Sequence, residues 1–462
     1  MASGSSRGRR TGLGAKRTCK KRHPQRAAGG DYYIQHTDKD MVLLIPSELQ
    51  ESVTVVKRVR RSEGVSLPIT TDCGWGSLMP HEIIYRVFQL VVDSEGAVPA
   101  LCRLAQVCRL WRQVASSPDL WLRVSVSRCW IVPTKTDPPN IQNKVKRTIE
   151  SVIRERLSQV GDFSLHHWNN HIPFVLQVDV NAVSRFLEIR GADLRCLYLS
   201  FSCQTNNIIS LLARGSCPEL RLLEVNRGMQ ERMREVHVSA EGLQTSCPKL
   251  EVLRLLNVVF SVKSKTPSYP ETPGFTCLQE LCLATSSFSL ITDGVCKRLL
   301  RDCTQLRVLD LRGCYKVTPE GICDLPCTDV ERLYLGMYCS DATVKPTLPS
   351  TGCALLTRRW CHSLQELDLT GQNFTECDLS QALGILSGAA SNETLQSLNL
   401  TGTKVHAAAV RDLLLSCRAL THLDLTSCRN IPRGLRCVYR GLEDVCQCLK
   451  TLTSRMVEES RD

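Results

Sequence analysis

The sequence has no apolar run long enough to cross a membrane. A membrane-spanning helix needs roughly 18–20 consecutive apolar residues, and no such stretch occurs among the 462 residues. The N-terminal residues also lack the apolar core of a secretory signal peptide. We therefore expect an intracellular protein, cytoplasmic and/or nuclear, with no membrane partner.

Closely spaced cysteine pairs are also missing, although cysteine itself is abundant. The chain has 25 cysteines and no Cys-x-x-Cys pair, which leaves zinc ribbons and thioredoxin-like redox sites without support. Reduced thiols are expected inside a cell. The cysteines recur at fixed offsets from leucines, so we interpret them as small core residues, and we expect no metal site.

Common catalytic motifs are absent as well. The sequence contains no GxxxxGK[ST], GxSxG or HExxH, and the pair His167 and His171 has no evident third ligand. We therefore expect a non-catalytic protein that needs no cofactor.

Positive charge is abundant, but most of the excess lies in the N-terminal tail. The formal net charge is +12, and nine basic residues precede the first acid, Asp31. Residues 1–72 are predicted to be a disordered basic region, because the tail has too little apolar content to form a core. The remainder is nearly balanced, so nucleic acid is not an expected partner. Two alternatives stay open for the tail, which are nuclear import and salt-sensitive nucleic-acid contact.

From Leu194 onward the chain repeats the pattern L-x-x-L-x-[LV]. Successive starts lie between 24 residues (Leu306 to Val330) and 34 residues (Val330 to Leu364) apart, which is typical of leucine-rich repeats. The nine motifs begin at Leu194, Leu220, Leu250, Leu278, Leu306, Val330, Leu364, Leu395 and Leu420. Because no repeat can bury its apolar face alone, residues 194–428 are predicted to stack into a curved α/β solenoid with parallel strands inside and helices outside.

The ends of the array are less regular. Residues 127–193 are predicted to be a linker and a degenerate opening repeat. Residues 429–462 are predicted to form a capping helix and tail, because apolar residues from Leu435 to Leu449 fall at helical spacing, and repeat arrays need such a cap.

Residues 73–126 carry three apolar helical patterns. A Met79-Pro80-His81-Glu82 entry precedes the first, in which Ile83, Val87 and Leu90 share one face, and Leu120-Trp121 closes the segment. We expect Leu101, Leu104, Cys108 and Trp111 to share a second helical face. Such a segment is too small for an enzyme and too apolar to stand alone, so we interpret it as a docking module.

This segment resembles an F-box, and the whole chain resembles the F-box and leucine-rich-repeat family. The resemblance implies a three-helix module that docks the Skp adaptor, S-phase kinase-associated protein 1, and through it a cullin scaffold and a RING subunit. The repeats would then bind an unknown protein to be ubiquitinated. The docking residues implied are Leu78, Met79, Pro80, Ile83, Ile84, Val87, Leu90, Leu101, Leu104, Val107, Cys108, Trp111, Leu120 and Trp121. The alternative is a repeat scaffold or inhibitor with no link to a ligase.

A substrate would meet the variable residues of the solenoid's inner face. The candidate residues lie between or beside the last two apolar positions of the motifs: Tyr198, Arg254, Asp310, Tyr334, Glu366, Asp368 and Asp424. The acids in the last repeats favour a basic substrate segment. The competing interpretation is that Asp is a tolerated residue at this strand position.

Overall fold

The computed structural model describes the parts of the chain that carry regular structure and their connections. The described residues are 25–26, 33–36, 41–44, 79–127, 160–166, 180–200, 205–226, 236–258, 260–262, 274–286, 289–338, 351–388 and 393–459. They belong to two units, residues 1–72 and 73–462.

The first unit contains three short strands. β1 (Gln25–Arg26) pairs antiparallel with β2 (Tyr33–His36), which pairs antiparallel with β3 (Met41–Leu44). The composition predicts no strands here. The rest of residues 1–72 lies outside the described residues, so its expected disorder stays a prediction.

The second unit begins with a group of short helices. They are α2 (His81–Glu95), α3 (Ala97–Leu104), α4 (Arg109–Val114) and the 3-10 turn η1 (Pro118–Trp121). Pro80 occupies the N-cap of α2, and Gly96, at φ 85°, allows the sharp turn into α3. Ile84 and Phe88 pack with Leu101 in one apolar core.

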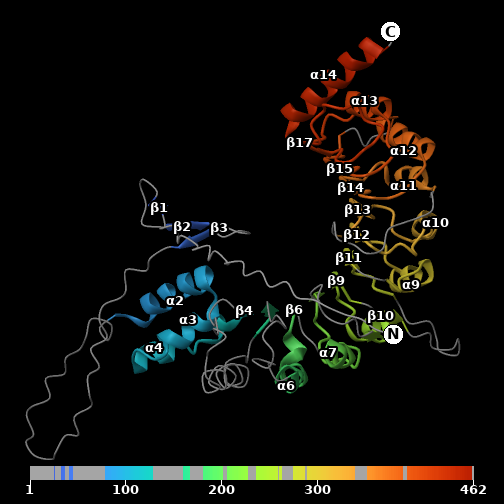
Figure 1. The fold of residues 1–462 in the computed structure, drawn as a ribbon. Coiled ribbons are helices and arrows are strands. Elements are labelled where there is room, and N and C mark those ends of the chain that lie inside the picture. Colours follow the sequence, from blue (N-terminus) through green and yellow to red (C-terminus); the bar gives the residue numbers. More distant parts are fainter. Residues whose placement is uncertain are drawn as a thin grey trace, which may run out of the picture. The chain divides into compact units, whose positions relative to one another are not determined.

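The helical group leads into an open, curved sheet of twelve strands (Figure 1). In pairing order the strands are β4 (Arg123–Ser127), β5 (Asp162–His166), β6 (Cys196–Ser200), β7 (Leu222–Asn226), β9 (Val252–Leu256), β11 (Glu280–Cys282), β12 (Val308–Asp310), β13 (Arg332–Tyr334), β14 (Glu366–Asp368), β15 (Ser397–Asn399), β16 (His422–Asp424) and β17 (Val438–Arg440). All neighbours are parallel except β16 and β17. This confirms the expected α/β solenoid.

The nine motifs set the register of this sheet. In this sheet every strand from β6 to β16 begins two residues after a motif start, and all nine motif starts are buried. Within a motif the fourth and sixth residues, such as Leu197 and Leu199, are also buried, except for the partly buried Leu335, because alternate side chains of a strand point to the same side.

Helices return the chain between strands and lie along one side of the sheet (Figure 1). They are α6 (Val180–Arg190), η3 (Gly191–Asp193), α7 (Thr205–Leu212), α8 (Ala240–Ser246), α9 (Asp293–Leu299), α10 (Pro319–Cys323), α11 (Cys353–Trp360), α12 (Glu376–Gly388) and α13 (Ala407–Ser416). An additional two-stranded parallel sheet, β8 (Val236–Val238) with β10 (Phe260–Val262), was not expected from the sequence.

The sheet extends two strands further toward the helical group than the nine motifs do. β4 begins two residues after Trp121 and pairs with β5, which pairs with β6. Phe163 of β5 is fully buried and lies 5.0 Å from the ring of Phe186 in α6. The solenoid is therefore continuous with the helical group.

The other end of the sheet differs from the sequence-based prediction. We expected one helix from Gly434 to Leu449, but Val438 lies in β17 and the helix α14 (Leu442–Glu459) begins only afterwards. The antiparallel pairing of β17 with β16 holds the backbone extended, and Gly441, at φ 85°, turns the chain into the helix. Val445, Cys448 and Leu452 then bury one face of α14.

Candidate functional site

The candidate docking residues of the helical group divide into two sets. Ile84, Leu101, Leu120 and Trp121 are at most 3% exposed and form its core. The partly buried Met79, Leu104 and Trp111 pack against this core. These residues shape the module, but they present little surface to a partner.

The second set is exposed. Ile83, Val87 and Leu90 of α2 are 51%, 46% and 56% exposed, and Val107 is 61% exposed. The first three recur at helical spacing, so α2 carries one apolar face outward and another, with Ile84 and Phe88, inward. Pro80 and Cys108 are exposed too, and Leu78 lies outside the described residues.

The expected second helical face is wrong. Leu101 and Leu104 belong to α3, whereas Trp111 belongs to α4 and Cys108 is the N-cap between them. Cys108 has extended backbone (φ −154°, ψ 177°), and its sulfur accepts a hydrogen bond from the backbone N of Trp111 at 3.4 Å. Cys108 therefore starts α4, whereas α3 has already ended at Leu104 with Ala105 as its C-cap.

The two tryptophans of the module hold its short helices together. Trp121 donates from Nε1 to the carbonyl of Ala115 at 2.7 Å. The ring of Trp111 meets Phe88 edge-on at 5.2 Å, an arrangement that aromatic pairs favour.

The inner face of the sheet, opposite the helices, aligns the second group of candidates. Strand pairing places Tyr198, Glu224, Arg254, Cys282, Asp310, Tyr334, Asp368, Asn399 and Asp424 in one row across nine strands. Glu366 lies in the neighbouring row, two residues before Asp368. The structure therefore brings all seven candidate substrate residues onto one surface.

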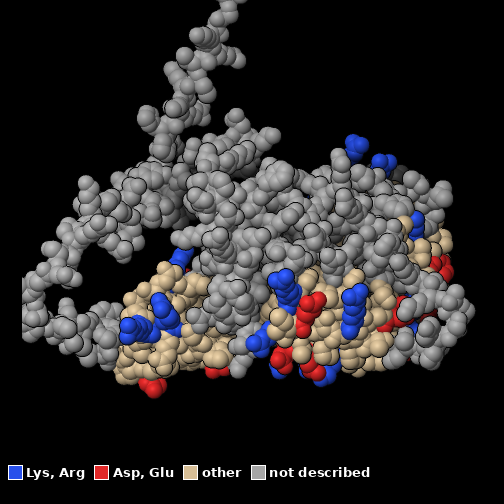
Figure 2. Space-filling model, turned by 90° about the horizontal axis from the view of Figure 1, so that it is seen from below, with Lys and Arg blue, Asp and Glu red and all other residues tan. Residues whose placement is uncertain are grey.

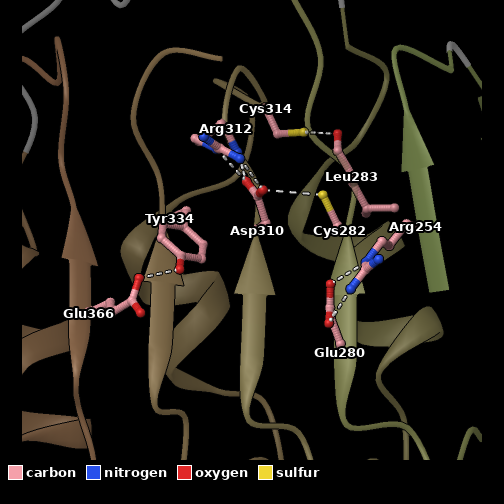
Figure 3. Close-up of polar contacts among 9 residues, drawn as sticks. All are labelled: Arg254, Glu280, Cys282, Leu283, Asp310, Arg312, Cys314, Tyr334 and Glu366. Atoms are coloured by element: carbon pink, nitrogen blue, oxygen red, sulfur yellow. Dashed lines mark hydrogen bonds and ion pairs between the residues drawn. The ribbon is translucent and has the colours of Figure 1, made fainter. Parts of the chain in front are cut away.

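Arg254 braces three strands of this face. Its guanidinium donates to Glu224 at 3.0 Å. It also donates to both oxygens of Glu280, at 2.5 and 3.0 Å (Figure 3). These bonds, first those to Glu280, raise the pKa of Arg254 above its usual value. The positive charge of Arg254 is therefore already paired with two carboxylates of the same chain.

Asp310 organises the next group of contacts. It accepts two bonds from the side chain of Arg312, at 2.9 and 2.7 Å, and one from the thiol of Cys282 at 3.2 Å (Figure 3). The guanidinium carbon of Arg312 also lies 5.3 Å from the ring centre of Tyr334. Tyr334 in turn donates to Glu366 at 2.5 Å, and burial followed by this bond raises the pKa of its hydroxyl.

The same row serves the turns that follow the strands. In four repeats the side-chain oxygen accepts the backbone N–H two residues on, at 3.2 Å for Asp310, 2.9 Å for Asp368, 3.1 Å for Asn399 and 2.9 Å for Asp424. This local bond is the usual reason for Asp or Asn at a turn. The bond gives these residues a structural role. The sequence alone indicated only that Asp is tolerated at this strand position.

The repeat cysteines are core residues. Cys217, Cys247, Cys303 and Cys327 are fully buried. Thiols also join neighbouring repeats, because Cys303 donates to the carbonyl of Leu278 at 3.3 Å. Burial raises the pKa of Cys217 and Cys247 to about 12.

The described part of the chain contains no group of three or more His, Cys, Asp or Glu side chains placed to hold a metal ion. No described helix is both long and apolar enough to span a membrane. In the view of Figure 2, acidic and basic side chains lie interspersed over much of the described surface.

Known proteins show similarity to this chain in sequence and in structure. A family model described as F-box-like matches residues 77–127. The chain is 29% identical over 309 residues to F-box/LRR-repeat protein 4 of Bos taurus, a match that covers 66% of this chain and 44% of that relative. A crystal structure of a TLR13–ssRNA13 complex aligns over 59% of this chain and 36% of that one, at 15% identity and a TM-score of 0.30.

Fold and comparisons together define the class: an F-box-like domain followed by a leucine-rich-repeat solenoid. They support an F-box/LRR family protein, and the chain spans less than half the length of its curated relative.

Proposed function

We propose that this chain is the substrate-recognition subunit of an SCF E3 ubiquitin ligase complex. Its F-box docks S-phase kinase-associated protein 1, which connects it to the cullin scaffold and the RING subunit, and its repeats bind the protein to be ubiquitinated. The chain itself acts as a non-catalytic adaptor, in the cytoplasm and/or the nucleus.

The observation that carries the proposal is the outward apolar face of α2. Ile83, Val87 and Leu90 are each about half exposed in a helix whose opposite face is already buried. Burying the remaining surface of each would stabilise a complex by roughly 1 kcal/mol. A short helix that presents such a row suits a partner groove.

Within the family, three strings look like F-box/LRR-repeat protein 6: WCHSLQELDLTGQ, LRVLDLRGC and IPRGLRCVYRGLEDVCQCL. We include kinship with that member in the proposal. Against that pattern the region from Phe163 to Arg190 looks short, and its described elements are β5 and α6.

The test is co-purification of the full chain with the Skp adaptor. The double variant Ile83→Lys with Val87→Lys places two charges on the exposed face, and we expect adaptor binding to fall at least tenfold. Both positions are exposed, so the circular dichroism spectrum should be unchanged. Leu415→Lys is the matched control, because Leu415 is 59% exposed on α13, far along the sequence from the F-box.

Retained adaptor binding by the double variant would reject the docking face. Absence of adaptor binding by the unaltered chain would instead favour the alternative, a repeat scaffold or inhibitor without a ligase.

A further inference from the structure

The pairing of charged side chains on the inner face of the sheet differs between its middle strands and its last strands. From β7 to β13 every arginine of the face is paired: Arg254 with Glu224 and Glu280, and Arg312 with Asp310. Arg332 lies 3.5 Å from Glu366, which also accepts from Tyr334. This part is braced by its own contacts.

The last three parallel strands differ. Asp368, Asn399 and Asp424 each use Oδ1 for their own turn. Their other polar atoms, Oδ2 of the two carboxylates and Nδ2 of Asn399, have no hydrogen-bond partner among residues 351–388 and 393–459 or elsewhere in the described chain. Two negative charges and a donor therefore remain available in one row.

The neighbouring row is mixed. It is apolar at Leu222, Val252 and Val308 and charged at Glu280, Arg332 and Glu366, and it ends with Ser397 and His422 on β15 and β16. Polar groups that can bond a peptide backbone thus flank the unpaired acids. Asp368, Asn399 and Asp424 are each partly exposed on this face.

We propose that the face of β14–β16 binds an extended basic segment of a protein, which crosses the strands and pairs two Lys or Arg side chains with Asp368 and Asp424. Asn399, between them, donates to a backbone carbonyl of the segment. The proposal deepens the proposed receptor function by naming its substrate class, although the contact itself does not depend on the F-box.

Strand spacing sets the separation of the two basic residues. Neighbouring strands lie about 4.8 Å apart, so Asp368 and Asp424, on strands separated by β15, are about 10 Å apart along the face. A segment in the extended polyproline II conformation advances about 3.1 Å per residue with three residues per turn, so side chains three positions apart point to the same side. Basic residues three positions apart therefore fit best.

The environment of Asp368 favours a cation. Burial raises the pKa of its carboxyl above the usual range, which shows that its charge has lost part of its hydration. A cation that pairs with such a group meets a smaller remaining desolvation cost. Arg312 is the arginine whose positive charge acts on Asp368. Its guanidinium is already bonded to Asp310.

The experiment measures binding of a fluorescein-labelled, Ala/Ser-based nonapeptide with two arginines three positions apart. Fluorescence anisotropy is recorded with the full chain at low and at physiological ionic strength. The test variant is Asp368→Asn with Asp424→Asn. Asparagine retains the turn bond, as Asn399 does at the equivalent position, so folding is preserved while both charges are removed. We expect about tenfold weaker binding.

Two variants separate this site from general electrostatic attraction. Glu224→Gln removes a carboxylate in the same row that is already paired with Arg254, and we expect no change in affinity. Asn399→Asp keeps the turn bond but replaces the proposed amide donor with a carboxylate that cannot donate to the backbone carbonyl. We expect severalfold weaker binding, whereas general electrostatic attraction would make binding tighter.

Three results would overturn the proposal: no binding of the peptide by the unaltered chain, no loss with the double Asn variant, or an equal loss with Glu224→Gln. Adaptor co-purification is measured on the same proteins. Peptide binding without adaptor binding would reject the receptor function alone, whereas adaptor binding without peptide binding would reject this inference alone.

Discussion

A single carboxylate, Asp310, connects three repeats. It receives the thiol of Cys282 on β11, bonds its own turn, and holds Arg312 beneath the ring of Tyr334 on β13. Asp310 is 5% exposed, so its charge depends on these partners. Removal of one member of a buried charged pair leaves the other uncompensated.

Asp310→Ala should therefore destabilise the protein by about 3 kcal/mol, at the low end for a buried pair because Arg312 is partly exposed. Asp424→Ala, at the same motif position, should cost only about 1 kcal/mol, because Asp424 makes a single turn bond. Urea unfolding of the two variants at equal protein concentration compares them. Equal midpoints would contradict the role of Asp310.

Backbone conformation decides whether a glycine in a helix or turn can be replaced by a residue with a Cβ. Gly384 lies inside α12, and a Cβ there would meet nothing within 4 Å. Gly313 lies in the turn after β12 at φ +81°, and a Cβ there would come within 2.0 Å of the carbonyl oxygen of Thr285.

Opposite effects follow for the same substitution. Gly384→Ala should stabilise the protein by about 0.5–1 kcal/mol, because alanine loses less conformational entropy in a helix. Gly313→Ala should destabilise it by about 2 kcal/mol through left-handed strain and collision. Thermal unfolding provides the readout, and a rise in midpoint for Gly313→Ala would refute the turn geometry.

Elements with the leucine motif were predictable from sequence, because burial of Leu194, Leu220 and their equivalents follows directly from the repeat. The opening strands were harder. β4 and β5 alternate apolar residues, as in Val124-Ser125-Val126, but lack the leading leucine that marks a motif. The helix break at Cys108 and the strand at Val438 depend on tertiary pairing and capping, and helical spacing alone misplaced both.

The sequence predicted the two candidate docking surfaces in different detail. Spacing identified the row Ile83, Val87 and Leu90, but it could not separate these exposed residues from the buried Ile84 and Leu101. On the inner face the motif fixed the row of residues. The pairing of Arg254 and Arg312 within the chain required three-dimensional contacts, since their partners lie up to 30 residues away.

At the scale of the whole molecule, one apolar core extends from Ile84 of the F-box to Leu452 of the terminal helix. Cysteine forms part of it throughout, with Cys217, Cys303 and Cys417 at equivalent places before their motifs. Thiol reactivity therefore reports on the fold of the entire array.

Alkylation with iodoacetamide at pH 8, followed by mass spectrometry, should modify the exposed Cys108, Cys377, Cys437 and Cys446. Cys217, with its pKa raised to about 12 by burial, should stay protected, because only on the order of one thiol in ten thousand is then a thiolate. In denaturant all should react. Rapid native labelling of Cys217 would contradict the register of the array.

The turn bond shared by Asp368, Asn399 and Asp424 has an evolutionary consequence. Aspartate and asparagine present the same oxygen to the backbone, so a one-for-one exchange alters the charge of the inner face without removing the bond that folds the turn. Selection for a different ligand and selection for a stable solenoid can then act on the same positions independently. Repeat proteins with this turn can diverge in specificity through such exchanges while they keep one scaffold.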